Sequence, residues 1–287
     1  MFMLVTGKQI LEHADQNGYA VGAFNVNNME IIQAIAEAAG DLKAPVILQA
    51  SQGAIKYAGV EYITSLVKTT AGLIDVPMAL HLDHGTDFDE IMKCIRNGFT
   101  SVMIDASKHE LEENIRLTKE IVRIAHSVGV SVEAELGKIG GTEDHIVVSE
   151  SEATYTDPEE ARIFVEETGV DSLAIAVGTA HGVYKGEPKV DIERIKEIDR
   201  VVSVPLVLHG SSGVPYDTLE NAVKAGIRKI NIDTDIRASF ATSVKEFVEA
   251  NPSEIDPRKI LKPARARMAD TVKEKIKVFG SDGKAWK

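Results

Sequence analysis

Residues 225–232 read AGIRKINI, a glycine near the start of an apolar run that is rich in β-branched residues. The same arrangement recurs at residues 17–21, 97–104, 128–132 and 168–175. A glycine in this position ends a helix in the left-handed conformation, and a strand begins a few residues later. Three further apolar runs each follow a proline, at residues 45–49, 77–82 and 205–209. Proline just before a strand also fits a helix-to-strand connection.

The pattern predicts eight short strands separated by helices. The strands are expected at residues 19–24, 46–50, 78–82, 101–105, 131–135, 172–177, 205–209 and 229–233. Apolar residues at helical spacing predict helices between them, for example at 29–39 and 111–126. Strands that alternate with helices form a parallel sheet. Eight alternations favour a closed (β/α)8 TIM barrel, typically ~250 residues long, over an open doubly wound sheet, for which a GxGxxG motif is missing.

The composition narrows the class of protein. The barrel uses nearly all 287 residues, so we expect one TIM-barrel domain over 1–287 with a C-terminal helical extension from residue 251. The 32 Lys and Arg against 44 Asp and Glu give a net charge of −12, which opposes binding to nucleic acid or anionic membranes. The single cysteine, Cys94, excludes a Cys-based zinc cluster and is expected to be a buried thiol. Neither a membrane span nor a signal peptide is recognisable, which favours the cytoplasm.

Three histidines point to a metal site. In a TIM barrel the active site lies at the carboxyl ends of the strands. His84, His181 and His209 follow three different strands there, and each is followed by glycine. Three imidazoles with one open position form a common catalytic zinc site. His81, inside the third strand, is expected to be a hydrogen-bonded interior residue instead.

Carboxylates and glycine-rich loops are expected at the same carboxyl ends of the strands as these histidines. Asp83 precedes a candidate ligand and could be a general acid/base or an anchor for that ligand. Asp105 and Glu135 end strands and could bind a second cation or hold positive side chains. The loops at 209–213 and 231–234 lead into helices and are expected to hold phosphate, although ordinary helix capping is the alternative.

The segment at 138–157 is expected to be a lid. It is long, contains Gly140-Gly141 as a hinge and shows a short hairpin near 146–148. A lid that carries a catalytic group, Glu143 or Asp144, is the functional interpretation.

Seven motifs in this order closely resemble the class II, zinc-dependent fructose-bisphosphate aldolases and the related tagatose-bisphosphate aldolases. They are GAFN at 22–25, LDHG at 82–85, VMID at 102–105, EAELG at 133–137, GTAHG at 178–182, LHGSSG at 208–213 and NIDT at 231–234. The resemblance implies that His84, His181 and His209 bind the catalytic zinc. It also implies that Asp105 and Glu135 can hold a second or displaced divalent ion.

The resemblance also assigns catalytic and substrate-binding roles. Asp83 would be the acid/base at the C4 oxygen, and Glu143 would exchange the proton at the nucleophilic carbon. A monovalent cation, Na⁺ or K⁺, often assists at the dihydroxyacetone-phosphate site. The implied substrate-binding residues are Asn25, Ser51, Gly182, Gly210, Ser211, Ser212, Asn231, Ile232, Asp233 and Thr234.

The implied reaction is reversible cleavage of fructose 1,6-bisphosphate to dihydroxyacetone phosphate and glyceraldehyde 3-phosphate through a zinc-stabilised enediolate (EC 4.1.2.13), a lyase step of glycolysis and gluconeogenesis. A tagatose 1,6-bisphosphate aldolase (EC 4.1.2.40) is the alternative, because Lys262 stands near the family's arginine for the second phosphate, with Arg265 three residues on. The Ser211 variant of the glycine motif favours fructose.

Other mechanisms and classes fit the sequence less well. A Schiff-base aldolase needs a lysine inside a barrel strand. The sixth strand has none, and Lys229 is expected at the start of the eighth strand, at the end opposite the active site. A zinc hydrolase would use the HLDH sequence at 81–84 but would leave the phosphate loops without a role. A structural barrel protein would not need the full set of polar residues at the carboxyl ends of the strands.

The resemblance also implies an assembly. The family is usually a homodimer or homotetramer, and the C-terminal extension is the expected contact between subunits.

Overall fold

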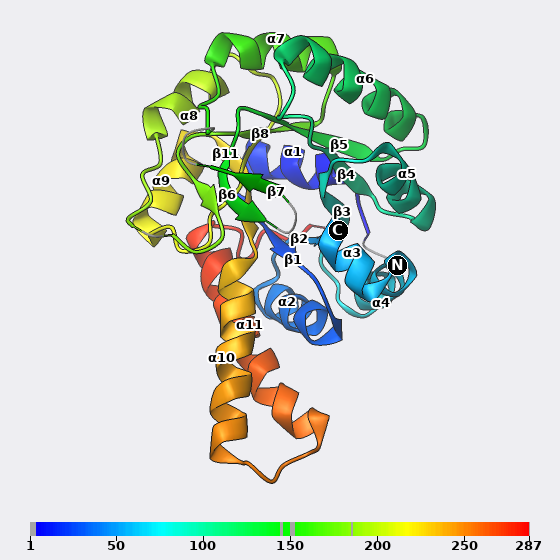
Figure 1. Ribbon diagram of the computed structural model, residues 1–287, viewed down its shortest axis with the longest axis vertical. Coiled ribbons are helices and arrows are strands. Elements are labelled where there is room, and N and C mark those ends of the chain that lie inside the picture. Colours follow the sequence, from blue (N-terminus) through cyan, green and yellow to red (C-terminus); the bar gives the residue numbers. More distant parts are fainter. Residues whose placement is uncertain (1–3, 144–145, 150–152, 185, 287) are drawn as a thin grey trace.

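Eight parallel strands close into a barrel in the computed structural model, which describes residues 4–143, 146–149, 153–184 and 186–286 (Figure 1). The barrel order β1-β11-β10-β8-β5-β4-β3-β2 places each strand beside its predecessor in the chain, and β11 closes the ring on β1. The strands are β1 (Val21–Asn25), β2 (Val46–Ser51), β3 (Met78–Gly85), β4 (Ser101–Ile104), β5 (Ser131–Leu136), β8 (Ser172–Ile175), β10 (Leu206–Leu208) and β11 (Ile227–Ile232). The predicted TIM barrel is confirmed, with every strand at its expected place.

Helices cover the outside of the barrel (Figure 1). Several of them end at the glycines of the recurring pattern: Gly18, Gly98 and Gly169 cap helices in the left-handed conformation, as predicted. The helices are α1 (Gly7–Asn17), α2 (Met29–Leu42), α3 (Gln52–Ala58), α4 (Val60–Leu73), α5 (Phe88–Asn97), α6 (Leu111–Ser127), α7 (Pro158–Thr168), α8 (Ile192–Asp199), α9 (Tyr216–Ala225), α10 (Thr234–Ala250) and α11 (Pro257–Val278).

The hydrophobic core has two parts. The larger part fills the layer between the strands and the surrounding helices, where alanine, valine, isoleucine and leucine side chains are almost fully buried. The smaller part lies under α1, where Ile10, Leu11 and Ala14 pack against Val21 and Ile47. Because α1 covers the amino-terminal ends of the strands, only their carboxyl ends remain for a site.

The C-terminal helices extend away from the barrel. Helices α10 and α11 form a hairpin that projects downward in Figure 1, and the later part of α11 packs against α2. The segment after α11 is tied to the barrel because the Phe279 carbonyl accepts a hydrogen bond of 3.0 Å from the Ala20 amide. The predicted C-terminal helical extension is therefore confirmed.

A small second sheet stands at the carboxyl end of the barrel. Strand β6 (Gly140–Glu143) pairs with β7 (Ile146–Val148) in an antiparallel hairpin and with the short strand β9 (Ala180–His181) in parallel. The hairpin expected near 146–148 is confirmed. Asp144 lies outside the described residues, as does the side chain of Glu143. No helix in the described parts of the chain is long and apolar enough to cross a membrane.

Candidate metal and phosphate site

Three histidine rings meet at the carboxyl end of the barrel. The His84 ring centroid lies 5.1 Å from that of His181 and 4.8 Å from that of His209, and the last two are 5.9 Å apart. One nitrogen of each ring falls within a single group that could hold a metal ion. The backbone of His84 is left-handed (φ 50°), which is uncommon for a residue with a side chain and typical of functional sites.

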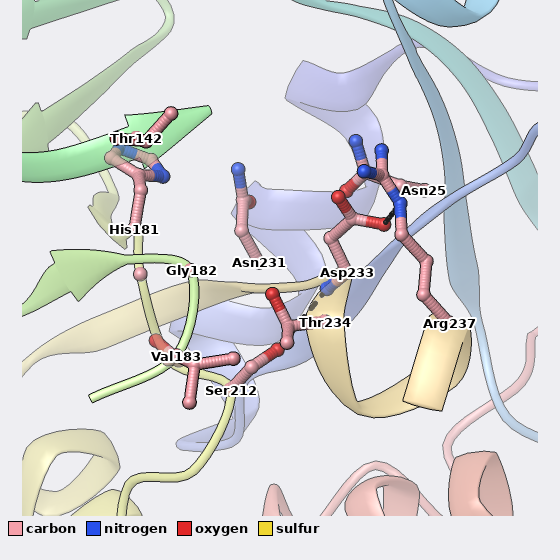
Figure 2. Close-up of a pocket in the computed structure, with 12 residues that line it drawn as sticks. Asn25, Thr142, His181, Gly182, Val183, Ser212, Asn231, Asp233, Thr234 and Arg237 are labelled. Atoms are coloured by element: carbon pink, nitrogen blue, oxygen red, sulfur yellow. Dashed lines mark hydrogen bonds and ion pairs between the residues drawn. The ribbon is translucent and has the colours of Figure 1, made fainter. Parts of the chain in front are cut away.

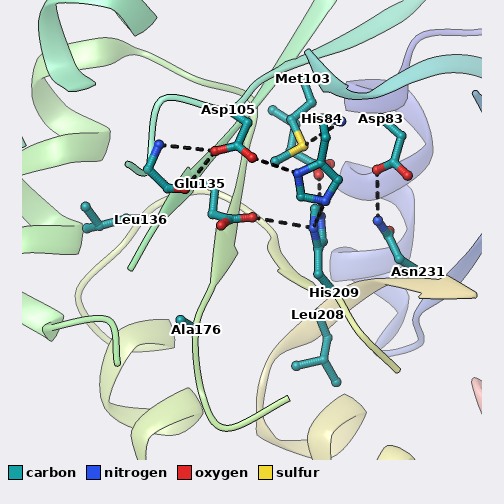
Figure 3. A network of polar contacts seen from close by, with 12 residues as sticks. Asp83, His84, Met103, Asp105, Glu135, Leu136, Ala176, Leu208, His209 and Asn231 are labelled. Atoms are coloured by element: carbon teal, nitrogen blue, oxygen red, sulfur yellow. Dashed lines mark hydrogen bonds and ion pairs between the residues drawn. The ribbon is translucent and has the colours of Figure 1, made fainter. Parts of the chain in front are cut away.

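Buried carboxylates fix which nitrogen of two rings faces the centre. Nδ1 of His84 donates to Asp105 Oδ2 at 2.8 Å, and Nε2 of His209 donates to Glu133 Oε1 at 3.0 Å. A neutral imidazole carries one N–H and one lone pair. The remaining nitrogens, Nε2 of His84 and Nδ1 of His209, therefore point their lone pairs at each other across 3.0 Å (Figure 3). Burial lowers the pKa of His209 to about 4, so this ring is neutral near pH 7.

Glu135 adds a third acceptor to the same place. Its Oε2 lies 3.5 Å from Nδ1 of His209, yet it accepts no hydrogen bond from the part of the chain that the structure describes. Burial and the charge of Asp105 raise the pKa of Glu135 well above its usual range. The two imidazole lone pairs and this oxygen converge on one place, where either a proton on Glu135 or a metal ion among them would offset their mutual repulsion. The residues present therefore fit a divalent metal ion of the kind that histidine and carboxylate bind.

Asp105 pairs with His84 rather than with a lysine or arginine. Burial opposes its ionisation, but the hydrogen bonds from His84 and Ser107 outweigh burial and hold the pKa of Asp105 well below its usual range. His84, Asp105 and Glu135 also form a second group whose ligand atoms lie close together. The sequence left open a second cation or a positive side chain at Asp105; the structure shows a hydrogen bond with His84, and the cation role stays a prediction.

A buried ion pair lies below the histidines. Lys229 Nζ binds both oxygens of Glu133, at 2.9 and 2.8 Å, and lies 3.4 Å from Nε2 of His81. His81 also shares a hydrogen bond of 2.8 Å with Ser101, so the expectation of a satisfied interior histidine is confirmed. Lys229 is the third residue of β11 and is 1% exposed, whereas the sequence placed it at the start of the strand. Because Glu133 binds its ammonium group, Lys229 is not set up as a Schiff-base lysine.

Three amides hold Asp83 beside the histidines. Its Oδ2 accepts hydrogen bonds from Asn25 Nδ2 at 2.8 Å and Gln49 Nε2 at 3.0 Å, and its Oδ1 accepts one from Asn231 Nδ2 at 3.2 Å. These donors come from β1, β2 and β11, so three neighbouring strands orient one carboxylate. Figure 3 shows the contact with Asn231. Asp83 is fully buried, and it directly precedes His84. The arrangement suits a carboxylate that accepts a proton at a fixed place.

A cavity of about 240 Å³ opens next to His181 (Figure 2). Its wall on one side is the loop after β10, where Ser212 Oγ accepts hydrogen bonds of 3.3 Å from the amides of Asp233 and Asp235 at the start of α10. Backbone N–H groups at a helix start and in glycine-rich loops are typical anion sites. The residues around the cavity are Asn25, Thr142, His181, Gly182, Val183, Gly210, Ser211, Ser212, Asn231, Asp233, Thr234 and Arg237.

Some predicted substrate residues do not line this cavity. Ile232 is fully buried in the core, and Ser51 caps α3 by accepting a hydrogen bond of 3.2 Å from the Ala54 amide. Lys262 and Arg265 lie on α11, where Arg265 binds Glu37 on α2 at 3.0 Å. Within one chain, neither basic residue faces the cavity.

Several residues of the site were missed from the sequence. Arg237 lines the cavity, and its Nε lies 2.7 Å from Oδ1 of Asp233, the N-cap residue of α10 four positions earlier. Opposite charges four residues apart at the start of a predicted helix are visible in the sequence, so this ion pair could have been found from it. Gln49, Glu133 and Lys229 gave the weaker signal of a polar residue inside an apolar strand.

Comparisons with known proteins agree over the whole chain. The family model described as fructose-bisphosphate aldolase class-II matches residues 5–284. The chain belongs to the class II fructose-bisphosphate aldolases. A fructose-bisphosphate aldolase of Thermus caldophilus is 49% identical, covering 99% of this chain and all of that protein, and one of Helicobacter pylori strain 26695 is 45% identical, covering 98% and 100%.

Solved structures of this class of barrel are also similar. The YdjI aldolase from Escherichia coli K12 has a TM-score of 0.88 at 38% identity, covering 99% of this chain and 100% of that one. A putative fructose-1,6-biphosphate aldolase from Coccidioides immitis has a TM-score of 0.88 at 30% identity and 97% coverage of both chains. Class II aldolases depend on a divalent metal, zinc, and the histidine group at this rim is the candidate site for it.

Proposed function

We propose that this class II aldolase cleaves fructose 1,6-bisphosphate reversibly to dihydroxyacetone phosphate and glyceraldehyde 3-phosphate, with His84, His181 and His209 as the zinc ligands. The observation that carries the proposal is the pair of imidazole nitrogens that face each other at 3.0 Å beside the unbonded oxygen of Glu135. Asp105 and Glu135 are the proposed place for a second or displaced divalent ion.

The bond cleavage needs charge stabilisation and proton transfer. When bound, zinc would supply Lewis-acid stabilisation of the charge that develops next to the substrate ketone. Asp83 takes the proton of the C4 hydroxyl as the C3–C4 bond breaks, and its three amide donors keep it oriented for that transfer. Glu143, in the lid strand β6, is proposed to exchange the proton at the nucleophilic carbon. A lid at this place excludes water from the reactive intermediate.

The cavity next to His181 is the proposed site of the dihydroxyacetone-phosphate half. Backbone N–H groups and hydroxyls are available in its wall, from Gly182, Gly210, Ser212 and Thr234. A monovalent cation, Na⁺ or K⁺, is proposed to assist there. Arg237 is the only positively charged side chain that the described residues bring to this lining, so we assign it, rather than Lys262 or Arg265, to a phosphate within one chain.

The choice between fructose and tagatose 1,6-bisphosphates is tested by measuring both rates side by side. Release of triose phosphates is followed with a coupled assay on the purified chain. We expect the higher kcat/KM on fructose 1,6-bisphosphate. A higher kcat/KM on the tagatose isomer would reassign the substrate, and no triose phosphate from either would reject the aldolase activity.

We also propose that the chain forms a homodimer or homotetramer in the cytoplasm. The hairpin of α10 and α11 projects from the barrel and exposes Val248 and Ile255, which are 45% and 89% exposed (Figure 1). Exposed apolar residues on a projecting element are typical of contacts between subunits. Light scattering on the purified chain measures the assembly, and a monomer at micromolar concentration would contradict this proposal.

A further inference from the structure

The hydroxyl of Tyr184 joins two backbone segments at the edge of the cavity. It donates a hydrogen bond of 2.7 Å to the carbonyl of Gly210 and accepts one of 2.8 Å from the amide of Ala180. Burial raises the pKa of Tyr184, so the phenol keeps the proton that it donates. One oxygen atom therefore satisfies a backbone donor in one segment and a backbone acceptor in another.

Both segments carry a candidate zinc ligand and a wall of the phosphate cavity. Ala180 directly precedes His181 and Gly182, and Gly210 directly follows His209. The two backbones touch: a Cβ on Gly210, whose φ is 61°, would lie 2.6 Å from the carbonyl carbon and oxygen of Ala180. A small shift between them would change the spacing of two histidines and of Gly182 and Gly210, which line the cavity.

The lid strand rests on the same segment. Gly141 of β6 pairs with His181 of β9, and a Cβ on Gly141 would lie only 2.3 Å from the His181 carbonyl oxygen. Only a glycine lets β6 approach β9 this closely. The position of the lid strand is therefore set by the backbone of Ala180 and His181, which Tyr184 ties to the loop after β10.

We propose that Tyr184 is a positioning residue, which acts through Ala180 and Gly210 to set the spacing of the zinc ligands, the phosphate cavity and the lid strand. The inference rests on the proposed function of this site as a zinc aldolase. Without the hydroxyl, the Ala180 amide and the Gly210 carbonyl lose the partner that they share. Removal of one oxygen should then weaken metal binding and substrate binding together.

The test is Tyr184→Phe, with Tyr216→Phe as the matched control. Tyr216 also donates a hydrogen bond, of 2.9 Å to Glu274, but it lies on α9 and does not line the cavity. For Tyr184→Phe we expect zinc affinity, measured by chelator competition without substrate, to fall about tenfold, as for other residues that orient ligands. We expect KM for fructose 1,6-bisphosphate to rise by about the same factor.

The control and the two readouts separate the outcomes. Tyr216→Phe should leave zinc affinity and KM within about twofold of the unmodified chain, a difference of only a few tenths of a kcal/mol. If Tyr184→Phe lowers only the melting temperature, or changes nothing, the positioning role is wrong. If the unmodified chain releases no triose phosphates, the proposed function fails instead, while the zinc measurement still tests the role of Tyr184.

Discussion

At the scale of single residues, the site depends on buried charges that are paired within the barrel. Glu133 is held by Lys229 on one side and holds Nε2 of His209 on the other. Despite the burial that opposes its ionisation, the charge of Lys229 holds the pKa of Glu133 well below its usual range. The ion pair thus acts on the metal site through the orientation of His209.

Lys229→Met should lower the free energy of unfolding of the metal-free protein by about 3–5 kcal/mol, because it leaves the Glu133 carboxylate buried without a cation. Adding Glu133→Gln in the same chain should recover a large part of that loss, since no buried charge then remains unpaired. Urea unfolding measures both. A double variant less stable than Lys229→Met would contradict the pairing.

Cys94 gives a prediction that depends on pH. Burial raises the pKa of its thiol to about 12, and the side chain is fully buried in the native protein. Because the thiolate is the reactive form, iodoacetamide should not modify the native chain at pH 8 and should modify it after unfolding in urea. Mass spectrometry follows the modification. Rapid labelling of the folded protein at pH 8 would contradict the buried, protonated thiol.

The three histidines of the site could be predicted because each lies at the carboxyl end of a barrel strand or in the loop after one. His84, His181 and His209 follow strands that the glycine and proline pattern locates. Lys262 and Arg265 are expected near the substrate from the resemblance alone; within this chain Arg265 binds Glu37 on α2, and their role toward the substrate stays a prediction. Which inward-facing side chains pair across a barrel depends on strand register, and a sequence pattern does not fix it.

At the scale of elements, the hairpin of β6 and β7, the proposed lid, pairs with a very short strand at the carboxyl end of the barrel. Strand β9 has only two residues, Ala180–His181, and its partner β6 lies about forty positions earlier in the chain. Two residues give no periodic pattern, so the sequence predicted the hairpin of β6 and β7 but not this pairing. The barrel strands were predictable because each is a buried apolar run preceded by a clear helix end.

Gly141→Ala should reduce kcat/KM at least tenfold by displacing β6 from His181, since its Cβ would lie 2.3 Å from the carbonyl oxygen. Gly129→Ala is the matched control: its φ is also positive, at 75°, but no atom lies within 4 Å of the added Cβ. Both variants carry the cost of a left-handed alanine, about 1–2 kcal/mol. Equal activity of the two variants would show that the lid contact is unimportant.

At the scale of the whole molecule, an acidic chain presents a site for a doubly phosphorylated sugar. The net charge of −12 repels such a ligand at long range, so the attraction has to be local. The glycine-rich loops and Arg237 line the cavity, and we propose that they, together with a bound metal ion, supply this attraction over a few ångströms. The sequence already indicated this contrast between overall and local charge, whereas the position of Arg237 required the structure.

We propose that the barrel and its C-terminal helices unfold as one unit over residues 1–287. Helix α11 packs on α2, and the Gly283 amide donates a hydrogen bond of 2.8 Å to the Leu42 carbonyl, which joins the end of the chain to the barrel. Calorimetry of the metal-free protein should give one transition with equal calorimetric and van't Hoff enthalpies per cooperative unit. Two separated transitions would divide the chain into two domains.

We propose above all that three histidines hold the zinc on which bond cleavage depends. The most direct measurement is the rate of triose-phosphate release after exhaustive chelation, followed by titration with zinc. We predict that chelation abolishes the activity, that one zinc ion per chain restores it, and that His209→Ala neither binds that ion tightly nor recovers. Full activity in the chelated protein, or in His209→Ala, would show that bond cleavage does not depend on zinc at these histidines.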